Sequence, residues 1–143
     1  MKIYFAGAIR GGRSDVQDYQ KIISHLQKYG KVLTEHVGDS TIDQQGEGEE
    51  SDRYIHDRDM KWLSQSDLIV AEVSTPSLGV GYEIGRAVED NKLILCLYRT
   101  NSEYKLSAML AGCDKMVCQR YNNITEAEKI VNKFIKSEFD NFY

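Results

Sequence analysis

Two almost wholly apolar runs, residues 68–73 and 93–98, constrain the fold of this chain more than any other feature. Strands that are apolar on both faces need cover on both sides, as in a parallel sheet. Helical patterns alternate with these runs along the chain, which is typical of an α/β protein. We therefore predict a Rossmann-like, doubly wound, five-stranded parallel sheet, with strands at residues 2–6, 31–35, 68–73, 93–98 and 115–118.

The length of 143 residues suits one such domain with its own core, so we expect a single domain over residues 1–143. Ser14 with Gln17 forms a capping box that predicts the start of the first helix. Thr125 with Glu128 predicts the start of the last helix in the same way. Further helical patterns lie at residues 54–65, 80–89 and 106–111.

The charge pattern limits the classes of partner. The net charge is -4 and there is no run of Lys and Arg, which argues against nonspecific binding to nucleic acid or to an anionic membrane. Residues 38–52 are acidic and poor in apolar side chains. We predict a loop there, either a solvated one or one that closes over a site.

No run approaches the 18 apolar residues of a membrane span, and the apolar run at the start is too short for a signal peptide. The three cysteines, Cys96, Cys113 and Cys118, form neither an even disulfide set nor a C-x-x-C pair, which fits a reducing compartment. We expect a cytoplasmic protein, or also a nuclear one if the source is eukaryotic.

The segment S-T-P-S-L-G-V-G-Y-E-I-G-R-A, residues 74–87, follows a strand and opens a helix, where parallel sheets present ligands. Glu83 is expected in the first turn, where the helix dipole would hold its carboxylate anionic and able to attack an electrophilic carbon. Alternatively, Glu83 only complements the dipole on a solvated surface. Gly79 and Gly81 clear the approach to it and Ser77 adds a hydroxyl, which favours a site.

A second carboxylate lies in an apolar stripe. Ile55, Asp59, Trp62 and Leu63 share one face of the helix predicted at residues 54–65. A charge in that stripe needs a partner or a function, so Asp59 either pairs with an arginine or has a raised pKa at a site. A pair of carboxyl groups, one anionic and one with a raised pKa, can cleave a glycosidic bond.

The two glycine loops do not match known cofactor motifs. Residues 7–14 resemble a P-loop, but Arg13 stands where the lysine is required. Residues 79–85 read G-x-G-x-x-x-G, one residue too long for the dinucleotide fingerprint. The histidines have no second ligand at metal spacing. The two glycine loops instead predict a small-anion pocket built from backbone N–H groups.

Five segments together resemble a known family: I-Y-F-A-G-A-I-R-G-G-R at residues 3–13, V-L-T-E-H-V at 32–37, I-H-D-R-D-M-K-W-L at 55–63, A-E-V-S-T-P-S-L-G-V-G-Y-E-I-G-R-A-V at 71–88, and L-S-A-M at 106–109. The chain resembles the 2'-deoxynucleoside 5'-monophosphate N-glycosidases, a branch of the nucleoside 2-deoxyribosyltransferase superfamily. Transferase relatives favour a proline after the first-strand A-G. Here Ala8 and I-R-G-G follow, which resembles the phosphate-using hydrolase branch.

The resemblance implies a homodimer, a five-stranded Rossmann-like sheet and no metal or organic cofactor. It implies that Glu83 is the nucleophile, with Tyr4 and Asp59 assisting. It also implies that Ser107 and Met109 reach into the neighbouring subunit's site, although a helix cap is the simpler role for Ser107. The residues implied to hold the 5'-phosphate are Gly7, Ile9, Arg10, Gly11, Ser77 and Gly79.

The sequence thus predicts an enzyme that hydrolyses the N-glycosidic bond of 2'-deoxynucleoside 5'-monophosphates through a covalent intermediate on Glu83. The products would be a free base and 2-deoxyribose 5-phosphate. A base-exchanging deoxyribosyltransferase is the first alternative, because a second base can intercept the same intermediate. The other alternative is a nucleotide-binding regulatory module without turnover.

Overall fold

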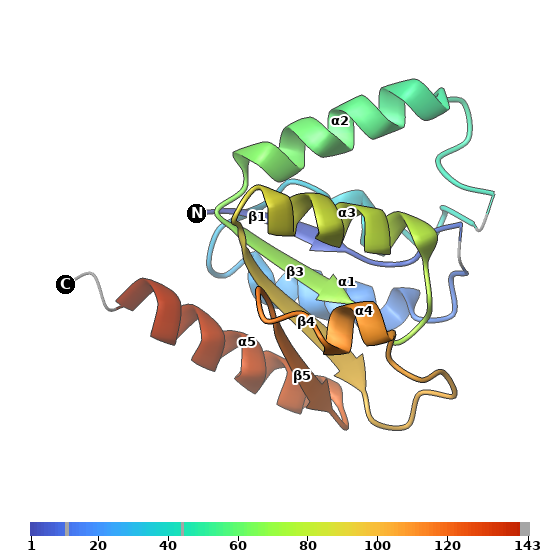
Figure 1. The fold of residues 1–143 in the computed structure, drawn as a ribbon. Helices are drawn as coiled ribbons and strands as arrows, with labels where there is room; N and C mark the ends of the chain where they lie inside the picture. Colours follow the sequence, from blue (N-terminus) through green and yellow to red (C-terminus); the bar gives the residue numbers. More distant parts are fainter. Residues whose placement is uncertain (11, 44, 141–143) are drawn as a thin grey trace.

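The computed structural model describes residues 1–10, 12–43 and 45–140, and its centre is a five-stranded sheet (Figure 1). All four strand pairings are parallel, and the order is β2-β1-β3-β4-β5. This is the doubly wound arrangement that the apolar runs predict, and that prediction is confirmed. The strands are β1 (Lys2–Ala6), β2 (Lys31–Val32), β3 (Leu68–Glu72), β4 (Leu93–Arg99) and β5 (Val117–Tyr121).

Helices cover both faces of the sheet (Figure 1). One face packs against α1 and α5, and the other against α2, α3 and the segment around α4. Among the described residues, no helix has the length and apolar character needed to cross a bilayer. The helices are α1 (Val16–Leu26), α2 (Asp52–Gln65), α3 (Leu78–Glu89), α4 (Ala108–Ala111) and α5 (Ile124–Phe139), with a 3-10 turn, η1, at Glu35–Gly38.

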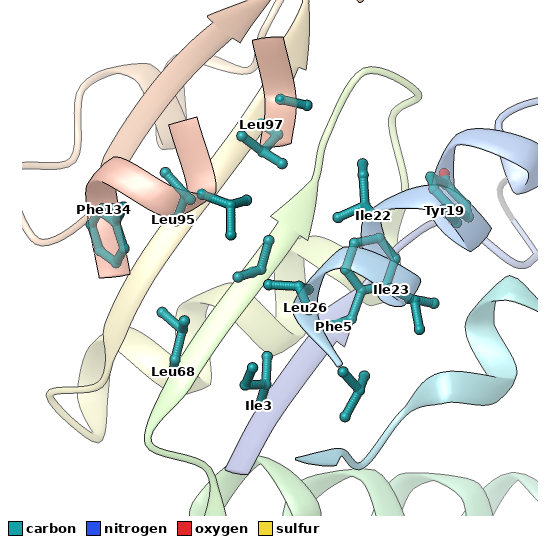
Figure 2. Close-up of a cluster of buried hydrophobic side chains, with 14 of the residues drawn as sticks. Ile3, Phe5, Tyr19, Ile22, Ile23, Leu26, Leu68, Leu95, Leu97 and Phe134 are labelled. Carbon is teal, nitrogen blue, oxygen red and sulfur yellow. The ribbon is translucent and has the colours of Figure 1, made fainter. Parts of the chain in front are cut away.

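Alternate residues of the three central strands, β1, β3 and β4, enter opposite cores. Phe5 and Leu95 of the sheet lie in one cluster with Leu26 of α1 and Phe134 of α5 (Figure 2). Complete burial of a Leu or Phe side chain contributes about 1.5–3 kcal/mol, so this cluster fixes α1 and α5 to the sheet. Tyr4 points to the opposite face, toward α2 and α3, because successive side chains of a strand alternate.

Strand β2 is shorter than predicted, because the Thr34 side chain makes the hydrogen bonds to the β1 backbone that a longer β2 backbone would make. The hydroxyl of Thr34 accepts from the Phe5 N–H at 2.8 Å and donates to the Phe5 carbonyl at 2.7 Å. The chain then turns into η1 instead of continuing as a strand. The fifth strand, predicted at residues 115–118, begins two residues later and runs to Tyr121.

Both predicted helix caps are wrong by one or two residues. Helix α1 has Asp15 at its N-cap, without a capping hydrogen bond, because the Asp15 carboxylate binds Arg99 and Thr75 instead. Helix α5 begins after Asn123, whose side chain accepts from the Glu126 N–H at 3.0 Å. Local propensity offers several caps at each of these helix starts, and tertiary contacts select one of them.

Between η1 and α2, the described residues of the acidic segment, 39–43 and 45–51, form a loop, as predicted. Arg13 holds it to the rest of the domain, donating to the carbonyls of Ile42 at 2.9 Å and Asp39 at 2.8 Å. Arg13 also donates to the Ala8 carbonyl at 3.1 Å. Its guanidinium is therefore used to fix this loop against the first glycine loop.

Candidate active site

The two glycine loops meet where the strand order changes direction. Strands β1 and β3 are neighbours in the sheet, and the helices that follow them, α1 and α3, cover opposite faces. Ligands of doubly wound sheets bind in the crevice at this position. A cavity of about 560 Å³ lies here, and Asp59 and Glu83 are both in its lining.

Glu83 is half-buried on α3 and faces the cavity. Burial and the charge of Asp59 raise its pKa to about 8, against a lowering by the hydrogen bond with Tyr4. The expectation of a first-turn carboxylate held anionic by the helix dipole is wrong. The helix begins at Leu78, because the Ser77 hydroxyl accepts from the Val80 N–H at 3.3 Å, and Glu83 therefore falls in the second turn.

Tyr4 brings a neutral donor to Glu83. Its side chain is 1% exposed on β1, and its hydroxyl hydrogen-bonds the Glu83 carboxyl group. Burial and the neighbouring carboxylates of Glu83 and Asp59 raise the pKa of Tyr4 far above its ordinary value. Tyr4 therefore keeps its proton throughout the physiological range.

Asp59 meets both expectations for it, since it lines the cavity and pairs with an arginine. The Arg58 side chain donates to Asp59 Oδ1 from Nε at 3.0 Å and from Nη2 at 2.9 Å. Burial raises the pKa of Asp59 and outweighs the lowering by Arg58. We call Asp59 and Glu83 the carboxylate pair, because each carries a raised pKa beside the other.

Sequence reasoning missed the residues that surround Asp59. Glu47, from the acidic loop, lines the same cavity and accepts from Arg58 Nη2 at 2.8 Å. His36 Nε2 lies 3.2 Å from Glu47, and the Arg58 guanidinium lies 4.7 Å from the centre of the Trp62 ring. No periodic pattern in the sequence marks this cluster. Arg58 of the helix contacts Glu47, 11 positions earlier, and His36, 22 positions earlier.

The predicted phosphate residues gather on the other side of the cavity. Its lining includes Gly7, Ile9, Arg10, Ser77 and Gly79, whereas Gly11 is outside the described residues. A side chain at residue 7 would overlap the Tyr19 ring, with a Cβ only 2.9 Å from it, so this position requires glycine.

Arg10 has a partner in the free protein. Its Nη2 atom lies 2.8 Å from Oδ1 of Asp52, the first residue of α2. Both side chains are exposed, which makes this a weak ion pair that an incoming anion can replace.

Ser107 and Met109 do not line the described cavity. The Ser107 hydroxyl accepts from the Met109 N–H at 3.3 Å and caps α4, and the Met109 side chain is 82% exposed. Within the described residues, no group of three or more His, Cys, Asp or Glu side chains could hold a metal ion.

A doubly wound α/β protein with a carboxylate pair and two glycine loops at its switch point has the equipment of a nucleotide glycosidase. The chain matches the family described as nucleoside 2-deoxyribosyltransferase over residues 3–136. The chain belongs to this family, as its motifs predict.

Individual relatives carry narrower names. A protein of Danio rerio named 5-hydroxymethyl-dUMP N-hydrolase is 60% identical over 112 residues, which is 78% of each chain. A protein of the same name from Tetraodon nigroviridis is 48% identical over 142 residues, covering 96% of this chain and 99% of its own. A solved CMP N-glycosidase from Clostridium botulinum shares the fold, with a TM-score of 0.67 at 19% identity, covering 94% of this chain and 99% of its own.

Proposed function

We propose that this protein hydrolyses the N-glycosidic bond of 2'-deoxynucleoside 5'-monophosphates to a free nucleobase and 2-deoxyribose 5-phosphate. The observation that carries the proposal is the cavity in which the carboxylate pair faces two loops suited to a phosphate. The names of the relatives support hydrolysis, and they make 5-hydroxymethyl-dUMP the first substrate to test.

The carboxylate pair can divide the chemistry between its members. Glu83 in its anionic form attacks the anomeric carbon and displaces the base, and water then hydrolyses the glycosyl-enzyme. Asp59 protonates the departing base or orients the sugar. Burial raises the pKa of both groups, and the charge of Asp59 raises that of Glu83 further, so a pair that holds one proton supplies both a nucleophile and an acid.

The phosphate would lie between the first glycine loop and the start of α3. Ser77 accepts one hydrogen bond from the Val80 N–H, which leaves its own proton free to donate to a phosphate oxygen. The N-terminus of α3 adds its dipole and its free backbone N–H groups. Arg10 would leave Asp52 for the stronger charge of the phosphate.

We propose that the protein forms a homodimer through α3 and α4. Leu78 is 97% exposed and Met109 is 82% exposed, which is unusual for large apolar side chains. Gly81 and Gly85 face open space on α3, and a partner backbone can approach closely there. Ser107 and Met109 would then complete the partner's site.

Subunit complementation tests this arrangement. Glu83→Ala and Ser107→Glu are each expected to be inactive, and a mixed dimer contains one site with both residues intact. Mixing the two proteins should then restore turnover. If mixed dimers, verified by a two-tag pulldown, recover no activity, the shared site is wrong.

We propose a reducing compartment, the cytoplasm or the nucleus, on the basis of the cysteines. Cys96, Cys113 and Cys118 are all free thiols in the structure. Disulfides rarely persist in such compartments, so free thiols in this number are ordinary there.

Product analysis tests the proposed function. The protein is incubated with 5-hydroxymethyl-dUMP, with each ordinary deoxynucleotide and with a ribonucleotide, with and without a second free base. We expect a free base and 2-deoxyribose 5-phosphate from the deoxynucleotides, and little from the ribonucleotide. A new nucleotide that incorporates the second base would instead identify a transferase, and no product at all would identify a binding module.

A further inference from the structure

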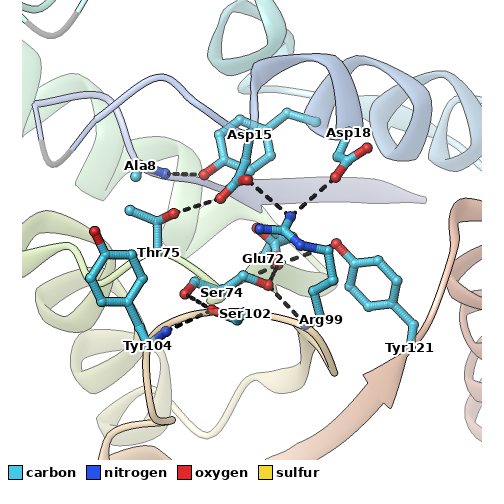
Figure 3. Close-up of polar contacts among 11 residues, drawn as sticks. Ala8, Asp15, Asp18, Glu72, Ser74, Thr75, Arg99, Ser102, Tyr104 and Tyr121 are labelled. Atoms are coloured by element: carbon cyan, nitrogen blue, oxygen red, sulfur yellow. Dashed lines mark hydrogen bonds and ion pairs between the residues drawn. The ribbon is translucent and has the colours of Figure 1, made fainter.

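A buried polar cluster lies beneath the two loops of the proposed phosphate site (Figure 3). Asp15 is at its centre, with only 6% of its surface exposed. Its Oδ1 atom lies 2.9 Å from Arg99 Nη1, and its Oδ2 atom accepts from the Thr75 hydroxyl at 2.6 Å. We call these three residues the Asp15 cluster.

The position of Asp15 in the chain makes these contacts unusual. An aspartate at a helix N-cap ordinarily accepts from a backbone N–H of the first turn. Asp15 occupies the N-cap of α1 and makes no such bond. Both carboxylate oxygens instead bind groups more than 50 residues away, so its side chain joins separate parts of the fold.

The Asp15 cluster joins the two loops that line the cavity. Asp15 ends the first loop, which contributes Gly7, Ile9 and Arg10 to the lining, and Thr75 lies two residues before Ser77 in the second. The loops also approach each other at Gly12, whose backbone has a φ of +132°. A Cβ atom there would lie 4.0 Å from the Thr75 methyl group.

Arg99 fixes the cluster from the end of β4. Its guanidinium also binds Asp18 at 3.2 Å, and its backbone N–H donates to the Ser74 hydroxyl at 2.8 Å. Ser74 in turn donates to the buried carboxylate of Glu72. Arg99 therefore supplies the charge that a buried Asp15 requires, and it holds the start of the second loop as well.

We propose that Asp15 is a positioning residue that sets the spacing of the two phosphate-binding loops through Thr75. The inference rests on the proposed function, because it assumes that these loops hold the 5'-phosphate. Loss of the Asp15–Thr75 hydrogen bond should weaken phosphate binding and leave the chemistry on the carboxylate pair unchanged, since Glu83 and Asp59 belong to α3 and α2.

Thr75→Val is the most direct test, because valine keeps the shape of threonine and replaces the hydroxyl with a methyl group that cannot hydrogen-bond Asp15. Thr75→Ser is the matched control, because it keeps the hydroxyl. We expect Thr75→Val to raise KM for a deoxynucleoside 5'-monophosphate about tenfold, with kcat within about threefold of wild type. For the deoxynucleoside without phosphate, kcat/KM should not change, and Thr75→Ser should remain close to wild type.

Asp15→Asn weakens the Asp15–Thr75 hydrogen bond from its other partner. It should likewise lower the preference for the monophosphate over the deoxynucleoside in kcat/KM. Thermal unfolding of every variant separates a folding defect from a binding defect. An equal loss on both substrates, or an unchanged preference for the monophosphate in Thr75→Val, would overturn the positioning role.

A binding measurement distinguishes this inference from the proposed function. Titration with inorganic phosphate, followed by calorimetry, needs no turnover. Weaker binding to Thr75→Val than to Thr75→Ser supports the role of Asp15, even if no nucleotide is hydrolysed. Equal phosphate binding by the two variants, or no binding by the wild-type protein, overturns it.

Discussion

Two groups of polar residues lie at the same edge of the sheet, and their electrostatics differ. The first, the structural cluster, is the Asp15 cluster together with Ser74 and Glu72. The second, the reactive cluster, is the carboxylate pair together with Tyr4 and Arg58.

Asp15 is buried with both oxygens bound, one to Arg99 and one to Thr75. Glu83 faces a cavity, and a hydrogen bond with the neutral Tyr4 lowers its pKa. Asp15, which is paired with a cation, holds the structure together, whereas Glu83, which is hydrogen-bonded to a neutral donor, keeps a raised pKa and faces the cavity, where it can react.

The largest effect should come from the reactive cluster. Glu83→Gln keeps the shape of the side chain and removes the nucleophile, so we expect kcat to fall at least about a thousandfold while substrate still binds. Steady-state kinetics and a binding titration measure the two quantities. A fall of less than tenfold in a pure preparation would remove Glu83 from this role.

Removal of a cation from the structural cluster should affect stability instead. Arg99→Met leaves Asp15 buried without its charged partner, which costs about 3 kcal/mol in the free energy of unfolding. Arg10→Met is the control, because its ion pair with Asp52 is exposed and contributes about 1 kcal/mol or less. Urea denaturation measures both variants, and equal losses would contradict a structural role for the Arg99–Asp15 ion pair.

Glu72 should make the stability of the structural cluster depend on pH. The side chain is completely buried, and burial raises its pKa to about 7 from an ordinary value of 4.5. The unfolded chain therefore releases this proton at lower pH than the folded protein does. The contribution of Glu72 to stability should be complete below about pH 4.5 and fall by about 3 kcal/mol as the pH rises to about 7.

Glu72→Gln provides the comparison, since an amide does not titrate. Urea denaturation at a series of pH values should show that this part of the pH dependence disappears in the variant. The same slope in both proteins between pH 4.5 and 7 would show that Glu72 does not titrate as described.

The reactive cluster should impose the opposite pH trend on catalysis. Because the pKa of Glu83 is about 8, kcat/KM should rise with pH up to that value, by about tenfold per pH unit below it. The nearby charge of Glu47 also raises the pKa of Glu83, so Glu47→Gln should move the midpoint to lower pH. If kcat/KM stays constant between pH 6 and 8, activity does not require Glu83 to be anionic.

The sequence predicted the parts of the molecule that depend on local pattern. The apolar runs gave β3 and β4, and their alternation with helices gave the parallel sheet. Asp59 and Glu83 were found because one lies in an apolar stripe and the other follows a glycine-rich turn. The structure places both in one cavity.

The parts that sequence reasoning missed depend on contacts between distant segments. Glu47 reaches Arg58 only because the acidic loop folds back over α2. Glu72 lies within an otherwise apolar strand, where hydrophobic pattern conceals a single carboxylate. Asp15 occupies the N-cap of α1, but its side chain binds partners far along the chain, which no local motif indicates.

The preference for a phosphate tests most directly the claim that the loops held by the structural cluster bind the 5'-phosphate while the reactive cluster carries out the chemistry. Values of kcat/KM are compared for a deoxynucleoside 5'-monophosphate and for the same deoxynucleoside. We expect a preference for the monophosphate of about a hundredfold or more, since charge-assisted hydrogen bonds contribute about 1.5–3 kcal/mol each. Equal values for the two substrates would contradict a phosphate site at the glycine loops and favour the base-exchanging transferase.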